Sequence, residues 1–402
     1  MAVLMSDGRI AEPPGPGGVA LFRLAFRPFF LFGALFSMVA VLLWSGLVSG
    51  VVTLDVYGGS HWWHAHEMLF GFVCAIAVGF LLTAVQTWTG IAGVRGWPLA
   101  GLFFLWLAAR VALLLPGSLP AWLPTTLDLL FLPVAAALLS IPIIRIRQWR
   151  NIVFLPVLLA MFAANCCFHL SAYRHDPTLQ ALSSNFMVML VTLLMTVVAG
   201  RVVPMFTANG TGTERVSPLP WLERLCPLTI LLAIPAALGL VPSAVVSACL
   251  LLLAAGCHGI RVLRWRTWIT WATPLVWSLH VSYWALVIGL ALLGISQLTD
   301  SVSHSQALHV LTVGAMGMMI LAMISRVSLG HTGRVLHVGP ALISAYIALF
   351  CALIVRVTGQ WWLMDYRAVV TASALLWALA FGLFFLRYLP ILASARPDGR
   401  PG

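Results

Sequence analysis

The sequence predicts an all-α integral membrane protein with about 12 transmembrane helices. Of the 402 residues, 61% are hydrophobic and only 8% are charged, which is more apolar surface than a soluble domain can bury. Apolar runs of about 20 residues recur along the chain, and this length crosses the hydrocarbon core of a bilayer as a helix. Helices satisfy their own backbone hydrogen bonds in lipid, so they are the expected spanning elements at these run lengths.

Twelve apolar segments account for the expected helices. The seventh and eighth are short and meet at Gly239-Leu240-Val241-Pro242, so this hairpin is the least regular part of the pattern. In chain order the segments are 28–50, 66–88, 97–116, 121–144, 152–173, 180–203, 227–241, 243–260, 270–295, 305–326, 339–356 and 368–389.

The distribution of arginine predicts the orientation. All 22 cationic residues are arginines. With the N-terminus inside, the outer side holds only Arg174, Arg356 and Arg367. Cytoplasmic loops of membrane proteins carry the excess of positive charge, so both termini are expected to be cytoplasmic. Because the charge is spread over loops, we expect a lipid bilayer and no nucleic acid as its partner.

Internal repetition predicts how the helices are grouped. Gly90, Gly210 and Gly333 follow the second, sixth and tenth segments at intervals of about 120 residues, which indicates three four-helix repeats with pseudo-threefold symmetry. The repeats lie near 23–150, 151–266 and 267–391 within one membrane domain, between a disordered cytoplasmic N-terminal tail at 1–22 and a C-terminal tail at 392–402.

A histidine pattern occurs on two of the equivalent segments. His-x4-His-x4-Gly opens the second segment at His61, His66 and Gly71, and the tenth at His304, His309 and Gly314. Both segments run from outside to inside, so His66 and His309 are expected at one depth near the outer surface. If equivalent helices face a common interior, these two imidazoles are predicted to be the axial ligands of a heme. The alternative is that they bond only each other or the backbone.

Further outer histidines are candidates for a second metal. They are His61, His64 and His304, and also His169 near the outer end of the fifth segment. Copper favours imidazole clusters, which predicts copper or a second heme beside the first. Interfacial histidines at helix ends fit the same pattern equally well.

Three residues are candidates for catalysis. Glu67 is a carboxylate at the membrane boundary, where charge is costly, and it fits a proton relay, a metal ligand or a salt-bridge partner. His280 and Tyr283 lie about halfway along the ninth segment and suit a copper site or proton delivery. Each also fits a hydrogen-bonded core residue.

Arginines near the outer side are candidates to bind a cofactor. Arg356 and Arg367, and with them Arg110, are predicted to hold heme propionates, which a bidentate guanidinium suits. Arg110 and Asp128 both fall in the outer third of their segments, so the alternative for Arg110 is a buried ion pair.

Several motifs together resemble the NnrS family of bacterial membrane proteins over nearly the whole chain. They are Phe26-Arg27-Pro28-Phe29-Phe30, Trp63-His64-Ala65-His66-Glu67-Met68-Leu69-Phe70-Gly71, Phe168-His169-Leu170, Ala199-Gly200-Arg201-Val202-Val203-Pro204-Met205-Phe206-Thr207, and the stretch from Ala307-Leu308-His309 through Gly314-Ala315-Met316-Gly317 and Ser325-Arg326 to Gly330-His331-Thr332-Gly333-Arg334. The resemblance implies a bacterial inner-membrane protein that contains heme and copper. It also implies a role in the nitric oxide response, in denitrification and nitrosative-stress defence.

The three repeats and the outer histidine pair are also similar to the catalytic subunit of heme-copper oxidases and nitric oxide reductases. The His-Pro-Glu-Val-Tyr copper motif of the oxidases is absent. We therefore expect a heme-binding redox protein that acts on nitric oxide or a related nitrogen species, with b-type heme, copper, and a quinol or cytochrome as electron donor. Whether it is an enzyme that reduces nitric oxide stays open.

Other function classes remain as alternatives. One is a twelve-helix transporter that exports a nitrosylated iron or thiol compound, although such proteins usually show inverted repeats with broken helices at the midplane. The others are a heme electron carrier and a sensor, both without turnover.

Overall fold

The computed structural model describes residues 3–4, 10–11, 19–120, 122–362 and 365–399. Within these residues the chain is almost entirely helical, and 11 helices are long and apolar enough to cross a membrane. The predicted class, an all-α multi-pass membrane protein, is confirmed. Most of the tail expected over 1–22 lies outside the described residues.

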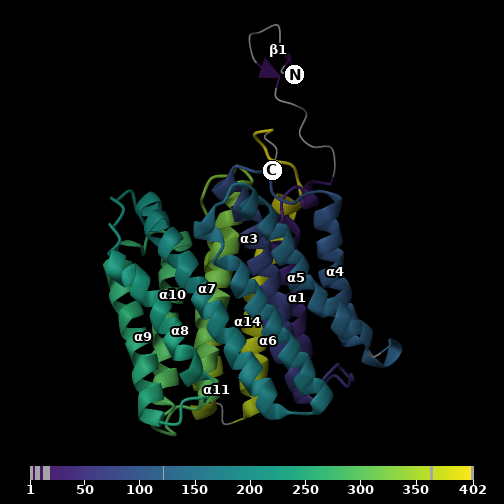
Figure 1. Cartoon of the computed structure of the whole chain (residues 1–402), viewed down its shortest axis with the longest axis vertical. Coiled ribbons are helices and arrows are strands. Elements are labelled where there is room, and N and C mark those ends of the chain that lie inside the picture. Colours follow the sequence, from purple (N-terminus) through teal and green to yellow (C-terminus); the bar gives the residue numbers. More distant parts are fainter. Residues whose placement is uncertain (1–2, 5–9, 12–18, 121, 363–364, 400–402) are drawn as a thin grey trace.

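The long helices form an upright bundle (Figure 1). Their bounds are α1 Phe26–Ser49, α4 Trp97–Leu114, α5 Trp122–Arg145, α6 Phe154–Arg174, α7 Pro177–Thr211, α8 Pro220–Ala237, α9 Ala244–Arg264, α10 Pro274–Ile295, α13 Pro340–Thr358 and α14 Tyr366–Ala393. The remaining two spans are Ser60–Thr89 and His304–His331, and each is divided into three elements.

The second and tenth spans change their helical form directly after a histidine. In the first, α2 Ser60–His66 is followed by a π-helical segment, η2 Glu67–Val73, and then by α3 Cys74–Thr89. In the other, α11 His304–His309 is followed by the π-helical η6 Val310–Gly317 and by α12 Met318–His331. The π-helix is rare overall, but it occurs often at functional sites. In both spans it begins directly after the second histidine of the repeated pattern.

Short elements complete the chain. Two strands, β1 Val3–Leu4 and β2 Ile10–Ala11, pair antiparallel near the N-terminus. Short 3₁₀ turns are η1 Ala20–Phe22, η3 Pro116–Ser118, η4 Trp149–Asn151, η5 Thr267–Ile269 and η7 Gly359–Trp361.

Helix α8 differs clearly from its expected segment. It begins at Pro220, seven residues before the expected segment, because proline fits the first turn, where its missing N–H costs nothing. Glu223 and Arg224 lie in its first turns, and the helix ends at Ala237. With α8 the described residues hold a helix for each of the 12 apolar segments, and 11 of these helices are long and apolar enough to cross a membrane.

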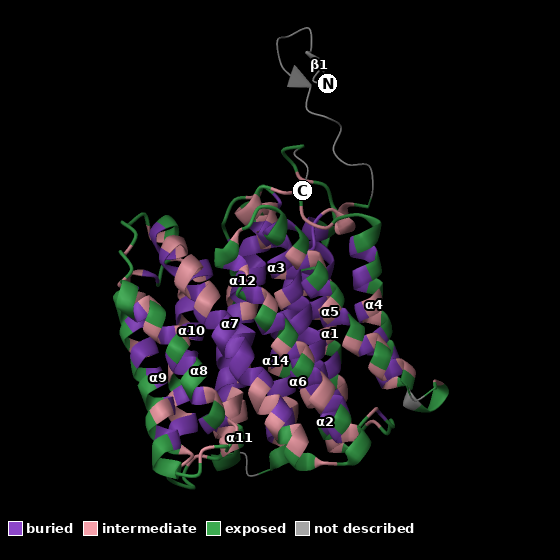
Figure 2. Ribbon diagram, viewed as in Figure 1, coloured by how far each residue is buried: buried purple, intermediate pink, exposed green. Residues whose placement is uncertain are grey.

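Three spans form the middle of the bundle. They are Ser60–Thr89, Pro177–Thr211 and His304–His331, with 78%, 67% and 72% of their apolar windows buried. Figure 2 shows the buried residues concentrated there, whereas α9 and α4 lie at opposite edges (Figure 1). The segments α2 and η2 contact α7, and α7 contacts η6. These are the spans that the repeat places in equivalent positions.

The two ends of the bundle differ in what they hold. The start of α1 and the end of α14 meet at one end, where Arg27 donates a hydrogen bond to the Leu392 carbonyl oxygen, and the labels of α2 and α11 lie at the other (Figure 2). We call the second the histidine end. The start of α11 there is fixed by a capping box, in which the side chains and backbones of Ser303 and Gln306 bond each other reciprocally.

Candidate functional site

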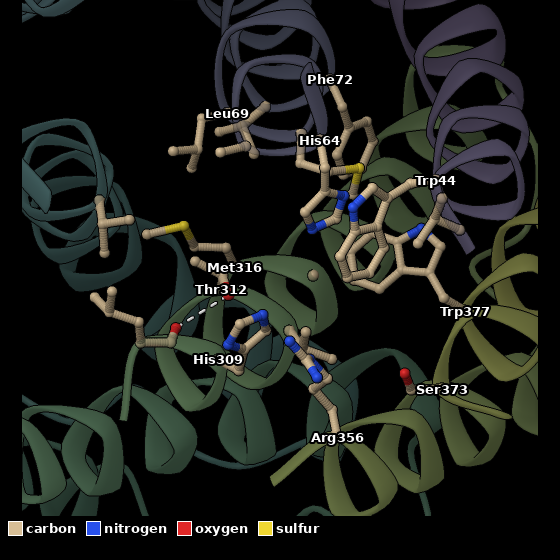
Figure 3. A pocket seen from close by; sticks show the side chains of 18 of the residues that line it. Trp44, His64, Leu69, Phe72, His309, Thr312, Met316, Arg356, Ser373 and Trp377 are labelled. Atoms are coloured by element: carbon tan, nitrogen blue, oxygen red, sulfur yellow. Dashed lines mark hydrogen bonds between the residues drawn. The ribbon is translucent and has the colours of Figure 1, made fainter. Parts of the chain in front are cut away.

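A large pocket near the histidine end lies between the middle of the bundle and its first and last helices (Figure 3). It encloses about 1050 Å³ of empty space, counting the open space at its mouth. Its lining comes from α1, α2, η2, α7, α11, η6, α13 and α14, and is mostly apolar. We call it the His64–His309 pocket after the two imidazoles that enter it from α2 and α11. The apolar lining with few polar groups is typical of a cofactor site.

His64 lines this pocket and has one nitrogen without a hydrogen-bond partner. Its ring stacks on the indole of Trp44, with 3.7 Å between ring centroids and an interplanar angle of 14°. The stacking fixes the plane of the imidazole. The Nδ1 atom of His64 is buried and makes no hydrogen bond within the described part of the chain. A buried polar atom without a partner is costly, which makes this histidine unusual among the lining residues.

His309 enters the same pocket with a defined tautomer. Its Nδ1 lies 2.6 Å from the carbonyl oxygen of Ser305, so Nδ1 carries the proton and donates it. The Nε2 atom therefore keeps its lone pair. This is the arrangement of a histidine that binds a metal, in which the second nitrogen is held by a backbone carbonyl.

Arg356 supplies positive charge beside the two histidines (Figure 3). Its guanidinium lies 6.0 Å from the ring centroid of Trp44 and 5.4 Å from that of Tyr366, and its Nη2 donates a 3.4 Å hydrogen bond to the Tyr366 hydroxyl. It is the one cation among the described lining residues. A guanidinium in this position suits a carboxylate of the bound group.

A second site lies on the side of α2 that faces away from the His64–His309 pocket. His66, Glu67, Arg110, Asp128, Asn165 and His169 form a hydrogen-bonded group that we call the His66 cluster. Each of the six residues is 4% exposed or less. They come from α2, η2, α4, α5 and α6.

Asp128 is the centre of the His66 cluster. Its Oδ2 lies 3.1 Å from His66 Nε2 and 3.0 Å from His169 Nε2, and it accepts a 2.6 Å hydrogen bond from Asn165 Nδ2. Its Oδ1 accepts from Arg110. The carboxylate thus connects two imidazoles and one guanidinium from three different helices, and the nitrogen and oxygen atoms of His66, Asp128 and His169 could hold a metal ion.

His66 and His309, the expected axial pair, are not brought together. The structure places His64 in the pocket with His309, while His66 stacks on Trp62, at 4.6 Å and 9°, and points toward α5 and α6. Two residues apart on a helix differ by about 200° in direction, so His64 and His66 face opposite sides.

His280 and Tyr283 lie in a third group, among α8, α9 and α10. His280 bonds Thr207 and Thr267 at 2.8 and 3.1 Å. The Tyr283 hydroxyl is 2.7 Å from His258 Nδ1, and it accepts from Arg261, which pairs with Glu223. Within the described part of the chain, neither His280 nor Tyr283 lines the His64–His309 pocket. Their catalytic roles stay predictions.

The other candidate residues are dispersed. His61 is exposed, and His304 Nε2 lies 3.4 Å from the amide oxygen of Asn185 at the edge of the pocket. Arg367 is exposed at the start of α14. Arg110, predicted to hold a propionate, instead bonds Glu67 at 2.8 Å and Asp128 within the His66 cluster, as its alternative interpretation required.

Comparison with known protein families identifies the chain. The family model described as NnrS protein matches residues 20–396. The chain belongs to the NnrS family. The resemblance inferred from the motifs is thereby confirmed, and it places the chain among the membrane proteins of the nitric oxide response, a family associated with heme and metal binding. No curated protein matches the chain.

Some residues of the pocket, of the His66 cluster and of the third group in this NnrS protein could hardly be identified from the sequence. Trp44 is one tryptophan of 17, and its contact with His64 depends on how α1 packs against α2. Asn165 precedes two cysteines and carries no motif of its own. His258 was not identified at all, and its spacing of three from Arg261 was the one available sign that the two share a helix face.

Proposed function

We propose that this NnrS protein binds heme in the His64–His309 pocket and acts as a redox protein on nitric oxide. One observation supports the proposal above the others. Two histidines from the second and tenth spans enter one apolar pocket, His64 with an unpartnered buried nitrogen and His309 with its other nitrogen engaged by a backbone carbonyl. Two histidines that enter one apolar pocket from different helices suit bis-imidazole ligation of a heme.

The residues present fit such a group. His64 and His309 would hold the iron, and Trp44 would keep the His64 ring in its plane. Arg356 would pair with a propionate. Phe72, Met316 and Trp377 add apolar walls that exclude water (Figure 3). Bound heme supplies one-electron chemistry with the protein as its electrostatic surroundings.

The chemistry we propose is the reduction of nitric oxide at the bacterial inner membrane. Two molecules of nitric oxide, two electrons and two protons give one nitrous oxide and one water. A quinol or a cytochrome would supply the electrons. Copper is the second cofactor that we propose for the protein. If both axial positions stay filled by histidine, the heme would serve electron transfer instead of binding substrate.

The test is an optical spectrum of the purified protein, oxidised, reduced, and reduced with nitric oxide. Heme type is read from the pyridine hemochrome of the same sample. We expect a low-spin b-type spectrum in the wild type, and its loss in His309→Ala. A spectrum of the reduced protein that shifts on addition of nitric oxide would support catalysis or scavenging, and one that does not shift would identify an electron carrier.

The control is His337→Ala, which changes a histidine outside the described pocket lining. Its heme content should equal that of the wild type. Folded protein that contains no heme when made in heme-replete cells would refute the proposal and favour the transporter.

A further inference from the structure

We propose that the His66 cluster is a second metal site, which holds a divalent first-row transition metal through His66 Nε2, His169 Nε2 and Asp128 Oδ2. The site is separate from the His64–His309 pocket. The described pocket lining includes none of these three residues.

The donor atoms converge as ligands of one ion do. The Oδ2 atom of Asp128 is 3.1 Å from His66 Nε2 and 3.0 Å from His169 Nε2. The three donor atoms all lie within 4.8 Å of one another. Ligands at about 2.1 Å from a metal are about 3.0 Å apart at right angles and about 3.4 Å apart at tetrahedral angles. The observed separations match the first of these values.

The charge of the cluster suits a bound cation. Glu67 and Asp128 contribute two negative charges, and Arg110 contributes one positive charge. No other charged side chain bonds these three within the described residues. With neutral imidazoles the net charge is negative, at positions that are 3% exposed or less. An uncompensated buried charge is strongly unfavourable, and a bound cation removes it.

The hydrogen bonds of His66 lead to the same conclusion. Its Nδ1 faces the carboxylate oxygen of Glu67 at 3.0 Å. Its Nε2 faces two further oxygens, from Asp128 and Asn165, both at 3.1 Å. A neutral imidazole has one N–H and cannot satisfy acceptors on both sides. A second proton on His66 or a metal ion at Nε2 resolves the conflict. With the metal, Nδ1–H donates to Glu67 while Nε2 and the oxygens bind the ion, and the metal content of the protein distinguishes the two.

An outer layer of residues holds the ligands in place. Glu67 orients His66, as carboxylates orient metal-binding histidines. On the other side, Thr125 lies 3.4 Å from His169 Nδ1 and bonds the hydroxyl of Tyr57 at 3.0 Å. Arg110 bonds the remaining oxygens of Glu67 and Asp128, so each carboxylate has one oxygen toward the guanidinium and one toward an imidazole.

The ligand set selects the class of metal. Two imidazoles and one carboxylate, without a thiolate, suit divalent iron, copper or zinc better than Cu(I). Three protein ligands leave further positions of the ion open for Asn165 Oδ1, water or a small molecule. The metal site does not depend on the heme, because the two sites share no ligand.

The test is the metal content and the electron paramagnetic resonance spectrum of the full-length protein. Iron, copper, zinc and manganese are measured together with heme, and heme iron is subtracted. Chelator-treated protein is then titrated with Cu²⁺. We expect one metal ion per chain beyond heme iron, and a Cu²⁺ spectrum with coupling to two imidazole nitrogens.

Matched variants identify the ligands. His169→Gln and Asp128→Asn should each weaken Cu²⁺ binding at least tenfold, and His169→Gln should leave coupling to one imidazole. Glu67→Gln should weaken binding by about 10- to 100-fold, as loss of an outer-layer carboxylate does. His61→Gln removes an exposed histidine and should bind Cu²⁺ as the wild type does.

Heme retention separates this proposal from the previous one. A variant with its heme spectrum intact and its second metal lost supports the metal site. Wild-type protein that neither contains a metal beyond heme iron nor binds Cu²⁺ overturns it. Coupling to fewer than two imidazoles in the wild type, or unchanged binding in both ligand variants, overturns it as well.

Discussion

Replacement of Gly71 by alanine should damage the His66 cluster from within its own helix. A β-carbon at this position would lie 2.6 Å from Arg110 Nη1, 2.7 Å from Glu67 Oε2 and 2.9 Å from Phe36 Cε1. The shortest of these is about 0.8 Å closer than the 3.4 Å at which ordinary van der Waals contact begins. The guanidinium, the carboxylate and the Phe36 ring must therefore all shift.

The size of the effect depends on which interaction yields. Overpacking of a buried site costs about 1–3 kcal/mol, and loss of one partner from a buried ion pair costs about 3–5 kcal/mol. We expect Gly71→Ala to lower the free energy of unfolding by an amount within these two ranges. It should also weaken binding of Cu²⁺, since Glu67 and Arg110 position the ligands.

The matched control is Gly101→Ala in α4, where a β-carbon would meet nothing within 4 Å. At such an open helical position alanine stabilises by about 0.4–1 kcal/mol. Unfolding is followed in detergent by titration with SDS, with heme and metal content measured on the same samples. If Gly71→Ala unfolds at the same SDS concentration as Gly101→Ala and binds Cu²⁺ equally well, the packing described for this site is incorrect.

Three further changes separate the roles of individual side chains. Arg356→Gln should lower heme retention and shift the heme midpoint potential, as measured by redox titration, whereas Arg367→Gln should leave both unchanged because Arg367 is exposed at the start of α14. Ser303→Ala removes the cap of α11 and should lower the free energy of unfolding by about 1 kcal/mol in the SDS titration; an unchanged value contradicts the cap. Tyr283→Phe leaves His258 Nδ1 without its partner at 2.7 Å and should destabilise by about 1–3 kcal/mol, with an unaltered heme spectrum. A slower reaction of Tyr283→Phe with nitric oxide, at unchanged heme content, would establish the catalytic role.

The fold class could be predicted from the sequence because the length of an apolar run depends on the lipid solvent and not on the neighbouring helices. Apolar length predicts a spanning helix wherever the solvent is lipid, so the spans were recognisable without knowledge of their neighbours. The start of α8 was missed because Pro220, Glu223 and Arg224 read as a loop, while the structure uses the proline in the first helical turn. Hydropathy does not detect the end of a helix whose residues are polar, as at the start of α8.

The sites were less accessible because they depend on rotation about a helix axis. The sequence repeat aligns His66 with His309 in register, and both directly precede a π-helical segment. The position of a residue along its helix predicts its depth in the bundle, but not the direction in which its side chain points. His66 points into the group formed by α5 and α6, while His309 points toward α13 and α14. His64 reaches the pocket because it lies two residues earlier on the helix.

The central claim is that the heme lies on the His64 side of α2 and the second metal on its His66 side. The direct measurement compares the heme spectra of His64→Ala and His66→Gln, purified in parallel and quantified per folded protein. We predict that His64→Ala loses the low-spin bis-imidazole spectrum and keeps the second metal, while His66→Gln keeps the spectrum and loses the metal. A low-spin spectrum that survives in His64→Ala and disappears in His66→Gln would contradict the assignment of both sites.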